Sequence, residues 1–317
     1  MNRRGFLYLT AAFGGLGLAG LAVGEGPVRG VSTGRRPGRC CHSDRDDSMA
    51  VTRRSSDNLA YQGTHILTHG AFRSLASRYE SDTGKRFTVY GGGCDDGITS
   101  VNAGGVDLGG LCCPVERTRA EGLPWVQVAW DIKVVIAHTS QPVDGLALDA
   151  LRDVVSGRAT RWSAVGGDDR PIALVYRDHC PDYIEPVRDL LLGNRQDWSP
   201  RALAVDTDEM LVDTVARFQG ALGVVSWVFA RDRVAAGELK VLAVDGVAPD
   251  SAEVATGRYP LVGPLNLVFK HWHAHRMAGF FEYLYSPAGQ SVMSELLVPV
   301  PPGTAGDPPP ELLSRFI

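Results

Sequence analysis

The chain has 317 residues, of which 44% are hydrophobic and 21% charged, and its formal net charge is −4. This length and composition predict a globular protein of two domains whose core needs no disulfide staples. The first 56 residues are net positive, so the remaining body carries about −9 by the same formal count. A body this acidic argues against a nucleic-acid partner, and a small solute is the expected partner instead.

The N-terminus has the pattern of an export signal. Arg3 and Arg4 precede an uncharged run, rich in glycine and alanine, from Leu7 to Val23. We therefore predict a twin-arginine-type signal over residues 1–24 and a periplasmic or other extracytoplasmic location. A membrane anchor is the alternative, although the run is at the short end of the range that spans a bilayer. Residues 25–56 lack apolar periodicity and are rich in Arg, Gly, Ser and Pro, which predicts a disordered linker.

Strand and helix patterns alternate through the rest of the chain. A short strand at 61–65 precedes a segment at 66–83 whose apolar residues recur at helical spacing, and Gly84 ends that helix. The alternation predicts an α/β fold with mixed sheets flanked by helices and a functional site in the loops. Further strands are expected at 87–90, 106–111, 126–137 and 172–176, and further helices at 148–156 and 184–192.

A series of short motifs follows in a characteristic order and spacing. The motifs are Gln141-Pro142-Val143, Ser156-Gly157-Arg158, Gly166-Gly167-Asp168, Gly220-Ala221-Leu222-Gly223-Val224, Tyr259-Pro260-Leu261, Gly263-Pro264-Leu265 and Ser286-Pro287-Ala288-Gly289-Gln290.

In this order the motifs resemble the periplasmic phosphate-binding proteins of ABC uptake systems, the PstS-like family. The resemblance implies a two-lobed periplasmic-binding-protein fold with a hinged cleft between the lobes. One lobe would hold 57–138 plus 248–317, and the other 139–247. It also implies a monomeric, non-enzymatic protein that binds a small inorganic ligand and presents it to a membrane permease or a sensor kinase.

The family's four ligand-binding turns fall on identifiable residues of this chain. The first falls on Thr64 and His65 and keeps a hydroxyl, and the second contains Cys94. The third carries Cys112 and Cys113 where the family has an aspartate that accepts a proton from phosphate. The fourth keeps Arg177, which is followed by His179 and Cys180. The resemblance thus implies a ligand site at these eight residues, with cysteine in three of the four turns.

Three interpretations of these cysteines stay open. Cys94, Cys112, Cys113 and Cys180 are even in number and would form disulfides in an oxidising compartment, or they are buried free thiols that pack as small hydrophobes. Alternatively, their thiolates converge on a metal ion, a metalloid such as trivalent arsenic or antimony, or an iron–sulfur cluster. We favour the third interpretation. Cys40 and Cys41 fall in the predicted linker.

The histidines, aspartates and arginine near the turns have separate expected roles. His65 and His179 are candidate nitrogen ligands, whereas Asp95 and Asp96 are expected to cap the helix after Cys94. His271, His273 and His275 are expected at the surface. Arg177 either binds an oxyanion or offsets the charge of the thiolates.

The leading hypothesis is a solute-binding protein that holds its ligand between the lobes through Cys94, Cys112 and Cys180, with Cys113 as a fourth group. One alternative is an exported iron–sulfur or metal-cofactor protein on the same fold. The other is a plain phosphate receptor, although this chain lacks the aspartate that distinguishes protonated phosphate from sulfate. An enzyme is not expected, because the side chains of the adjacent His179 and Cys180 diverge and no nucleophile–base pair is evident.

Overall fold

A computed structural model of the chain describes residues 58–193, 197–309 and 312. The predicted export signal at 1–24 and the predicted linker at 25–56, with Cys40 and Cys41, lie outside the described residues. Within the described ranges, no helix combines the length and apolar character needed to cross a bilayer.

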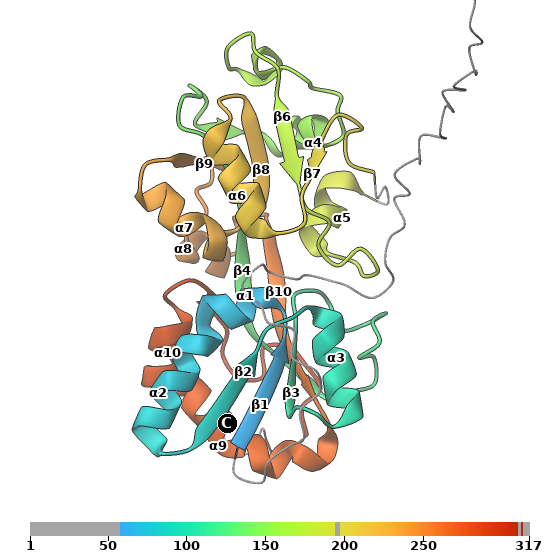
Figure 1. Ribbon diagram of the computed structural model, residues 1–317, viewed down its shortest axis with the longest axis vertical. Helices are drawn as coiled ribbons and strands as arrows, with labels where there is room; N and C mark the ends of the chain where they lie inside the picture. Colours follow the sequence, from blue (N-terminus) through green and yellow to red (C-terminus); the bar gives the residue numbers. More distant parts are fainter. Residues whose placement is uncertain (1–57, 194–196, 310–311, 313–317) are drawn as a thin grey trace, which may run out of the picture. The chain divides into compact units, whose positions relative to one another are not determined.

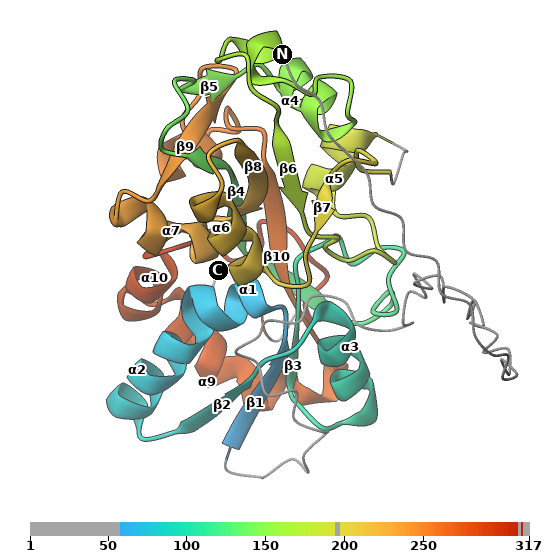
Figure 2. The same cartoon turned by 45° about the horizontal axis from the view of Figure 1, so that its top comes forward.

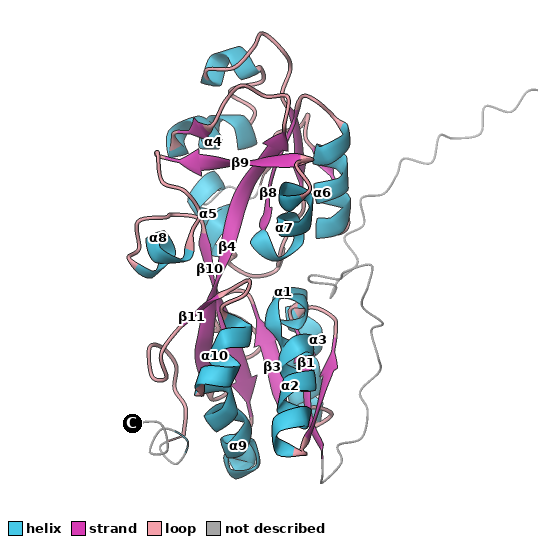
Figure 3. Ribbon diagram, turned by 90° about the vertical axis from the view of Figure 1, so that its left-hand side faces the viewer, coloured by secondary structure: helices cyan, strands magenta, loops and turns pink. Residues whose placement is uncertain are grey.

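The first lobe is a mixed sheet with helices on both sides (Figures 1 and 3). β1 pairs in parallel with β2 and β3, while β10 runs antiparallel to β3 and β4. A cluster of buried aromatic and aliphatic side chains forms its core. Its elements are β1 (Asn58–Gly63), α1 (His65–Leu67), the π-helix η1 (Thr68–Phe72), α2 (Arg73–Thr83), β2 (Arg86–Tyr90), α3 (Cys94–Ala103), β3 (Leu108–Leu111), β10 (Val262–Phe269), the 3-10 helix η3 (His271–His273), α9 (Ala274–Tyr285), α10 (Pro287–Met293) and β11 (Val298–Pro299).

The second lobe is built on a separate core around the far half of β4 (Trp125–His138). Here β8 and β9 run antiparallel to β4, and β6 runs parallel to β7 and β8. Its elements are β5 (Gly145–Leu146), α4 (Leu148–Val155), the 3-10 helix η2 (Trp162–Val165), β6 (Ala173–Tyr176), α5 (Pro186–Leu192), β7 (Leu203–Ala204), α6 (Asp208–Arg217), β8 (Ala221–Ser226), α7 (Trp227–Ala235), β9 (Leu239–Val244) and α8 (Ser251–Ala255). The expected boundary at 248 differs from the structure, because Val254 of α8 packs in the second core.

A single long strand, β4, belongs to both sheets. Its residues up to Ile132 pair with β10, and from Lys133 onward they pair with β8 (Figure 1). Residues 126–137 were predicted as strands and form one unbroken strand, because each half finds partners in a different sheet. The residues at the crossover therefore lie where the two lobes meet.

The predicted helix at 66–83 is present but irregular at its start. It begins as α1, widens into the π-helix η1 and continues as α2. Gly70 lies in η1, and a Cβ there would be 2.9 Å from the side chain of Val228 on α7. The first turns of this helix thus pack closely against the second lobe, and π-turns of this kind often occur at functional sites.

Candidate functional site

The predicted site residues follow the carboxyl ends of strands in both lobes. In the first lobe, β1 leads to Thr64 and His65, β2 leads through a glycine turn to Cys94, and β3 leads to Cys112. In the second lobe, β6 leads into the segment that begins at Arg177. Parallel strands present their carboxyl ends at one edge of a sheet, and this edge is where α/β proteins bind ligands. The strand order therefore brings these turns together.

Three cysteine sulfurs form a compact triangle, called the thiol triangle below. The Sγ atom of Cys94 lies 3.5 Å from that of Cys112 and 3.6 Å from that of Cys180, and the last two are 3.5 Å apart. None of the three residues is more than 3% exposed, and the sulfur separations are too long for a disulfide within the triangle. Cys94 and Cys112 come from the first lobe and Cys180 from the second. The three sulfurs thus converge as the turns predict, and they form no disulfide with one another.

Cys113 lies apart from the thiol triangle. Only Cys94, Cys112 and Cys180 among the described cysteines form a group whose sulfurs all lie within 4.8 Å of one another. Cys113 packs in the first-lobe core, and its carbonyl accepts a hydrogen bond from the Asn266 side chain at 2.9 Å. The structure therefore brings three of the four predicted thiols together.

Close backbone contacts hold Cys94 against Cys112. Gly97, one turn into α3, lies so near the sheet that a Cβ there would be 2.5 Å from the carbonyl oxygen of Gln62. A Cβ on Gly63 would be 2.2 Å from the backbone nitrogen of Gly110. Only glycine permits approaches this close. The start of α3 therefore docks on the ends of β1 and β3, and the Cys112 backbone N–H donates to the Cys94 sulfur at 3.3 Å.

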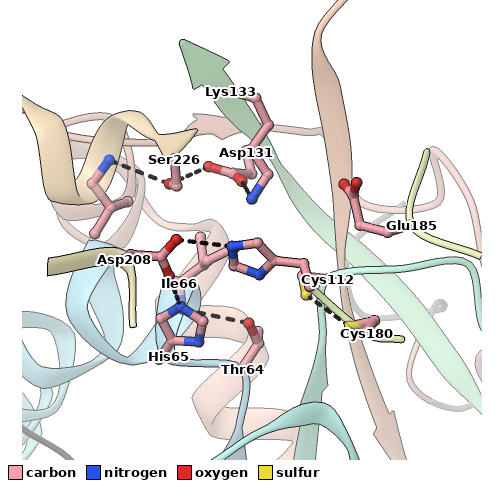
Figure 4. A network of polar contacts seen from close by, with 12 residues as sticks. Thr64, His65, Ile66, Cys112, Asp131, Lys133, Cys180, Glu185, Asp208 and Ser226 are labelled. Atoms are coloured by element: carbon pink, nitrogen blue, oxygen red, sulfur yellow. Dashed lines mark hydrogen bonds and ion pairs between the residues drawn. The ribbon is translucent and has the colours of Figure 1, made fainter. Parts of the chain in front are cut away.

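A second buried cluster surrounds Asp208, at the start of α6 (Figure 4). One carboxylate oxygen contacts His65 and Arg177, and the other contacts His179 Nε2 at 2.8 Å. The imidazole rings of His65 and His179 are stacked, with centroids 5.6 Å apart. His65 belongs to the first lobe and the other three residues to the second, so the cluster joins the lobes.

This cluster keeps Asp208 ionised despite complete burial. Burial, the largest influence, by itself raises the pKa of the Asp208 carboxyl. The charges of Arg177 and His179, together with hydrogen bonds from His179 and His65, outweigh burial and hold the pKa well below its ordinary value. Arg177 is thus paired with a carboxylate of this chain, a partner that the sequence analysis did not foresee.

A third set of buried polar groups lies at the crossover strand (Figure 4). Lys133 Nζ lies 3.0 Å from Asp131 Oδ2, and Asp131 Oδ1 accepts a hydrogen bond from Ser226 at 2.5 Å. Burial by itself lowers the pKa of Lys133, but Asp131, Glu185, Asp208 and Cys112 raise it above the ordinary lysine value. Lys133 therefore stays cationic, and its charge interacts with Cys112 of the thiol triangle.

The loop that carries Cys180 is held by one arginine. Arg188 on α5 is buried and donates hydrogen bonds to the carbonyls of His179 at 2.6 Å, Cys180 at 3.2 Å and Tyr183 at 2.6 Å. Cys180 has φ 46°, in the left-handed region that costs a residue with a side chain about 1–2 kcal/mol. The chain thus holds a cysteine in a conformation that favours glycine.

The other predicted polar residues fall in varied places. Asp96 caps α3 through the Gly93 N–H at 2.9 Å, as expected. Asp95 instead is buried, pairs with Arg119 at 2.6 Å and accepts a hydrogen bond from Tyr183. His273 was expected at the surface but is only 6% exposed, because η3 turns it inward.

Sequence reasoning missed Asp208, Asp131, Lys133, Glu185 and Arg188. Asp131 and Lys133 could have been identified from the sequence pattern. They interrupt the apolar run of β4 two residues apart, with opposite charges on the same strand face. No such signal marks Asp208, because its partners come from segments more than 25 residues away.

Comparisons with known proteins identify the family to which the chain belongs. Residues 65–288 match a family model described as the PBP superfamily domain. The chain is 24% identical over 220 residues to the phosphate-binding protein PstS of Bacillus subtilis, covering 68% of this chain and 71% of that protein.

Solved structures share the fold. One is a phosphate ABC transporter substrate-binding protein from Clostridium perfringens with bound phosphate, with a TM-score of 0.66, 20% identity and coverage of 77% of this chain and 99% of that one. Another is an ABC-type phosphate transport receptor from Vibrio cholerae, with a TM-score of 0.62, 21% identity and coverage of 77% and 100%. The two-lobed α/β fold implied by the sequence resemblance is confirmed.

Proposed function

The chain belongs to the PBP superfamily, and on that basis we propose that it is an extracytoplasmic solute-binding protein whose ligand is a thiophilic metal or metalloid. The ligand is held between the lobes by Cys94, Cys112 and Cys180. The protein acts as a monomer without catalysing a reaction and presents its ligand to a membrane permease or a sensor kinase. The curated PstS relative and the two solved structures named above support the receptor role at the level of the family.

The thiol triangle is the observation that carries this proposal. Three sulfurs from three separate turns meet at 3.5–3.6 Å, and none of the three residues is more than 3% exposed. Soft thiolate ligands select soft or borderline metal centres over hard oxyanions. The left-handed backbone conformation of Cys180 adds support, because strained residues cluster at functional sites.

A plain phosphate receptor is the second candidate. Thr64 and Arg177 occupy the places where the family resemblance implies phosphate-binding groups, and the relatives carry phosphate in their names. Two features weigh against it. Arg177 is already paired with Asp208, and three sulfurs occupy the centre where phosphate would need hydroxyl and amide donors.

The described cysteines bring together three of the thiolates that an iron–sulfur cofactor would need, and Cys40 and Cys41 lie outside the described residues. Clusters of the four-iron type need four cysteine thiolates. Cys113 is the remaining described cysteine, and it lies outside the group of sulfurs within 4.8 Å of one another.

Calorimetry on the reduced full chain under anaerobic conditions tests the proposal. Wild type should bind arsenite, Zn²⁺ or Cu⁺, with at least one of them at 1:1 stoichiometry, and should not bind phosphate. Cys112→Ser should lose that binding at least 100-fold, because serine keeps the volume and a hydroxyl but gives up the soft ligand. Cys113→Ser is the matched control, since it is adjacent and equally buried but lies outside the triangle. Tight phosphate binding that persists in Cys112→Ser would replace this proposal with the phosphate receptor.

A further inference from the structure

A buried glycine at the crossover between the lobes borders an open space. Gly263 on β10 is buried, and its register partner on β4 is Asp131. Among the described residues, a Cβ at Gly263 would meet two atoms within 4 Å beyond its chain neighbours. These are the Cys112 carbonyl oxygen at 3.8 Å and Glu185 Oε1 at 3.9 Å. Protein interiors are close-packed, so contacts this sparse leave room for a methyl-sized group. We call this space the Gly263 chamber.

Two charged side chains beside the chamber carry buried polar atoms that make no hydrogen bond to the described residues. Glu185 is 5% exposed and Lys133 is 4% exposed. Glu185 Oε2 accepts the Arg188 backbone N–H at 2.6 Å, whereas Oε1, the atom that faces the chamber, has no hydrogen-bond partner. Lys133 Nζ lies 3.0 Å from Asp131 Oδ2, but the geometry of this ion pair is not that of a hydrogen bond. Such atoms are rare in native proteins, and a bound water or ligand group is one physical reason for them.

The chamber lies between the lobes, next to the thiol triangle. Glu185 precedes α5 of the second lobe, whereas Cys112 follows β3 of the first lobe and also supplies a sulfur of the triangle (Figure 4). The charge of Lys133 interacts with both Glu185 and Cys112. A group bound in the chamber therefore contacts residues of both lobes.

The atoms around the chamber favour one kind of guest. The oxygens of Glu185 and Cys112 are acceptors, so a guest must donate a hydrogen bond to them. The ammonium group of Lys133 has only donors, so the same guest must also accept one. A metal ion or an ammonium group cannot accept, and a carboxylate cannot donate. A hydroxyl group does both, and a buried hydroxyl or water typically has about two to four polar partners of this kind.

We propose that the Gly263 chamber binds a hydroxyl group that bridges the lobes, donating to Glu185 Oε1 and accepting from Lys133 Nζ. The hydroxyl belongs either to a water molecule or to the ligand of the cleft, and both sources share this chemistry. The proposal goes beyond the proposed function and does not depend on what the thiol triangle binds. In the receptor it would favour ligands that carry a hydroxyl or a bound water over bare ions.

Thermal unfolding of Gly263→Ala tests the proposal on reduced, ligand-free, full-length protein. The new methyl group fits without a clash, and the backbone of Gly263 is not left-handed. If a hydroxyl is bound, the methyl group displaces it and Glu185 Oε1 loses its donor, so the melting temperature should fall by about 2 °C or more. If the chamber is dry, the methyl group fills it, and a melting temperature that stays the same or rises would overturn the proposal. Gly279→Ala is the control, because its Cβ meets only the flexible end of Lys85 at 3.4 Å, and it should not lower the melting temperature.

Crystal structures of the reduced protein, alone and soaked with zinc chloride or sodium arsenite, identify the source of the hydroxyl. An oxygen atom about 3 Å from Glu185 Oε1 is expected. It is a water if it has no covalent or metal bond, and it belongs to the ligand if it is bonded to zinc or arsenic. Zinc or arsenic bound at the triangle of a closed protein with no oxygen in the chamber would overturn this proposal and leave the proposed function standing. An oxygen in the chamber of a protein that binds neither would do the reverse.

Discussion

At Asp208, burial raises the pKa of the carboxyl whereas ion pairing and hydrogen bonding lower it, and the lowering is larger. The residue therefore acts as a fixed anion at the meeting point of the lobes. It contacts Arg177 and two imidazoles through both of its oxygens. One carboxylate thus links residues of both lobes.

Replacing this carboxylate should expose its contribution to stability. Asp208→Asn should lower the free energy of unfolding by about 3–5 kcal/mol at pH 7, because it leaves Arg177 buried beside a neutral amide. A carboxyl whose folded pKa is depressed stabilises the protein above its unfolded pKa of about 3.9, and this contribution is lost as pH falls toward the folded pKa. The difference in the free energy of unfolding between wild type and Asp208→Asn should therefore become smaller below about pH 4.

Urea unfolding at several pH values between 7 and 3 measures this gap. Asp149→Asn is the control, since Asp149 is 91% exposed and its pair with Arg152 should contribute less than about 1 kcal/mol. A gap for Asp208→Asn that stays constant from pH 7 to pH 3 would contradict the assigned ionisation.

At the scale of elements, the positions of the sulfurs depend on how α3 and the Cys180 loop pack against their neighbours. α3 docks through Gly97 on the ends of β1 and β3, and the loop is tied to α5 through Arg188. These contacts fix the backbone from which each sulfur projects. The triangle is thus a product of helix and strand placement rather than of cysteine spacing.

Gly97→Ala should displace the Cys94 sulfur indirectly, by shifting helix α3. The new methyl group would meet the backbone of Gln62 and Gly63, so α3 must shift, at a cost of about 1–3 kcal/mol in stability. Because Cys94 begins this helix, affinity for arsenite should fall at least tenfold.

Gly279→Ala is the matched control for this substitution. Gly279 also lies within a helix, α9, and a Cβ there meets only the flexible end of Lys85 at 3.4 Å. It should gain up to about 1 kcal/mol of stability from helix propensity and keep its affinity. Calorimetry and thermal unfolding of both variants test the argument, which fails if Gly97→Ala binds arsenite like wild type.

On the scale of the whole molecule, the described residues make polar contacts between the lobes on either side of the thiol triangle. Tyr183 from the second lobe donates to Asp95 of the first. Asp208 on α6 contacts His65 on α1 (Figure 4), and Figure 2 shows these two helices next to each other where the lobes meet. The triangle itself joins Cys180 to Cys94 and Cys112. Under the proposed function, closing of the lobes and completion of the ligand site are therefore expected to be the same event.

Removing one of these contacts should weaken closure. Tyr183→Phe loses a hydrogen bond to a charged group, which contributes about 1.5–3 kcal/mol, so affinity for arsenite should fall roughly 10- to 100-fold. Small-angle scattering of the ligand-free variant should show a larger radius of gyration than wild type.

Tyr283→Phe provides a control with the same chemistry inside one lobe. Its hydroxyl donates to Asp82 at 2.7 Å, and Arg78 contacts the same carboxylate, as Arg119 does at Asp95. This variant should leave both affinity and radius of gyration unchanged. Equal effects of the two substitutions would mean that Tyr183 does not act through closure.

The sequence by itself determined the alternation of strands and helices, the family and the turns that carry the ligand groups. These follow from local periodicity and from motifs that keep their order along the chain. The family resemblance in the sequence also implies that cysteine stands where relatives have oxygen ligands. Only the tertiary structure decided which thiols meet, since Cys112 and Cys113 are neighbours in sequence and only Cys112 joins the triangle. It also decided the partner of Arg177 and the burial of Asp131 and Lys133. The physical reason is that burial and charge pairing join segments far apart in the chain, and a linear pattern does not encode these distances.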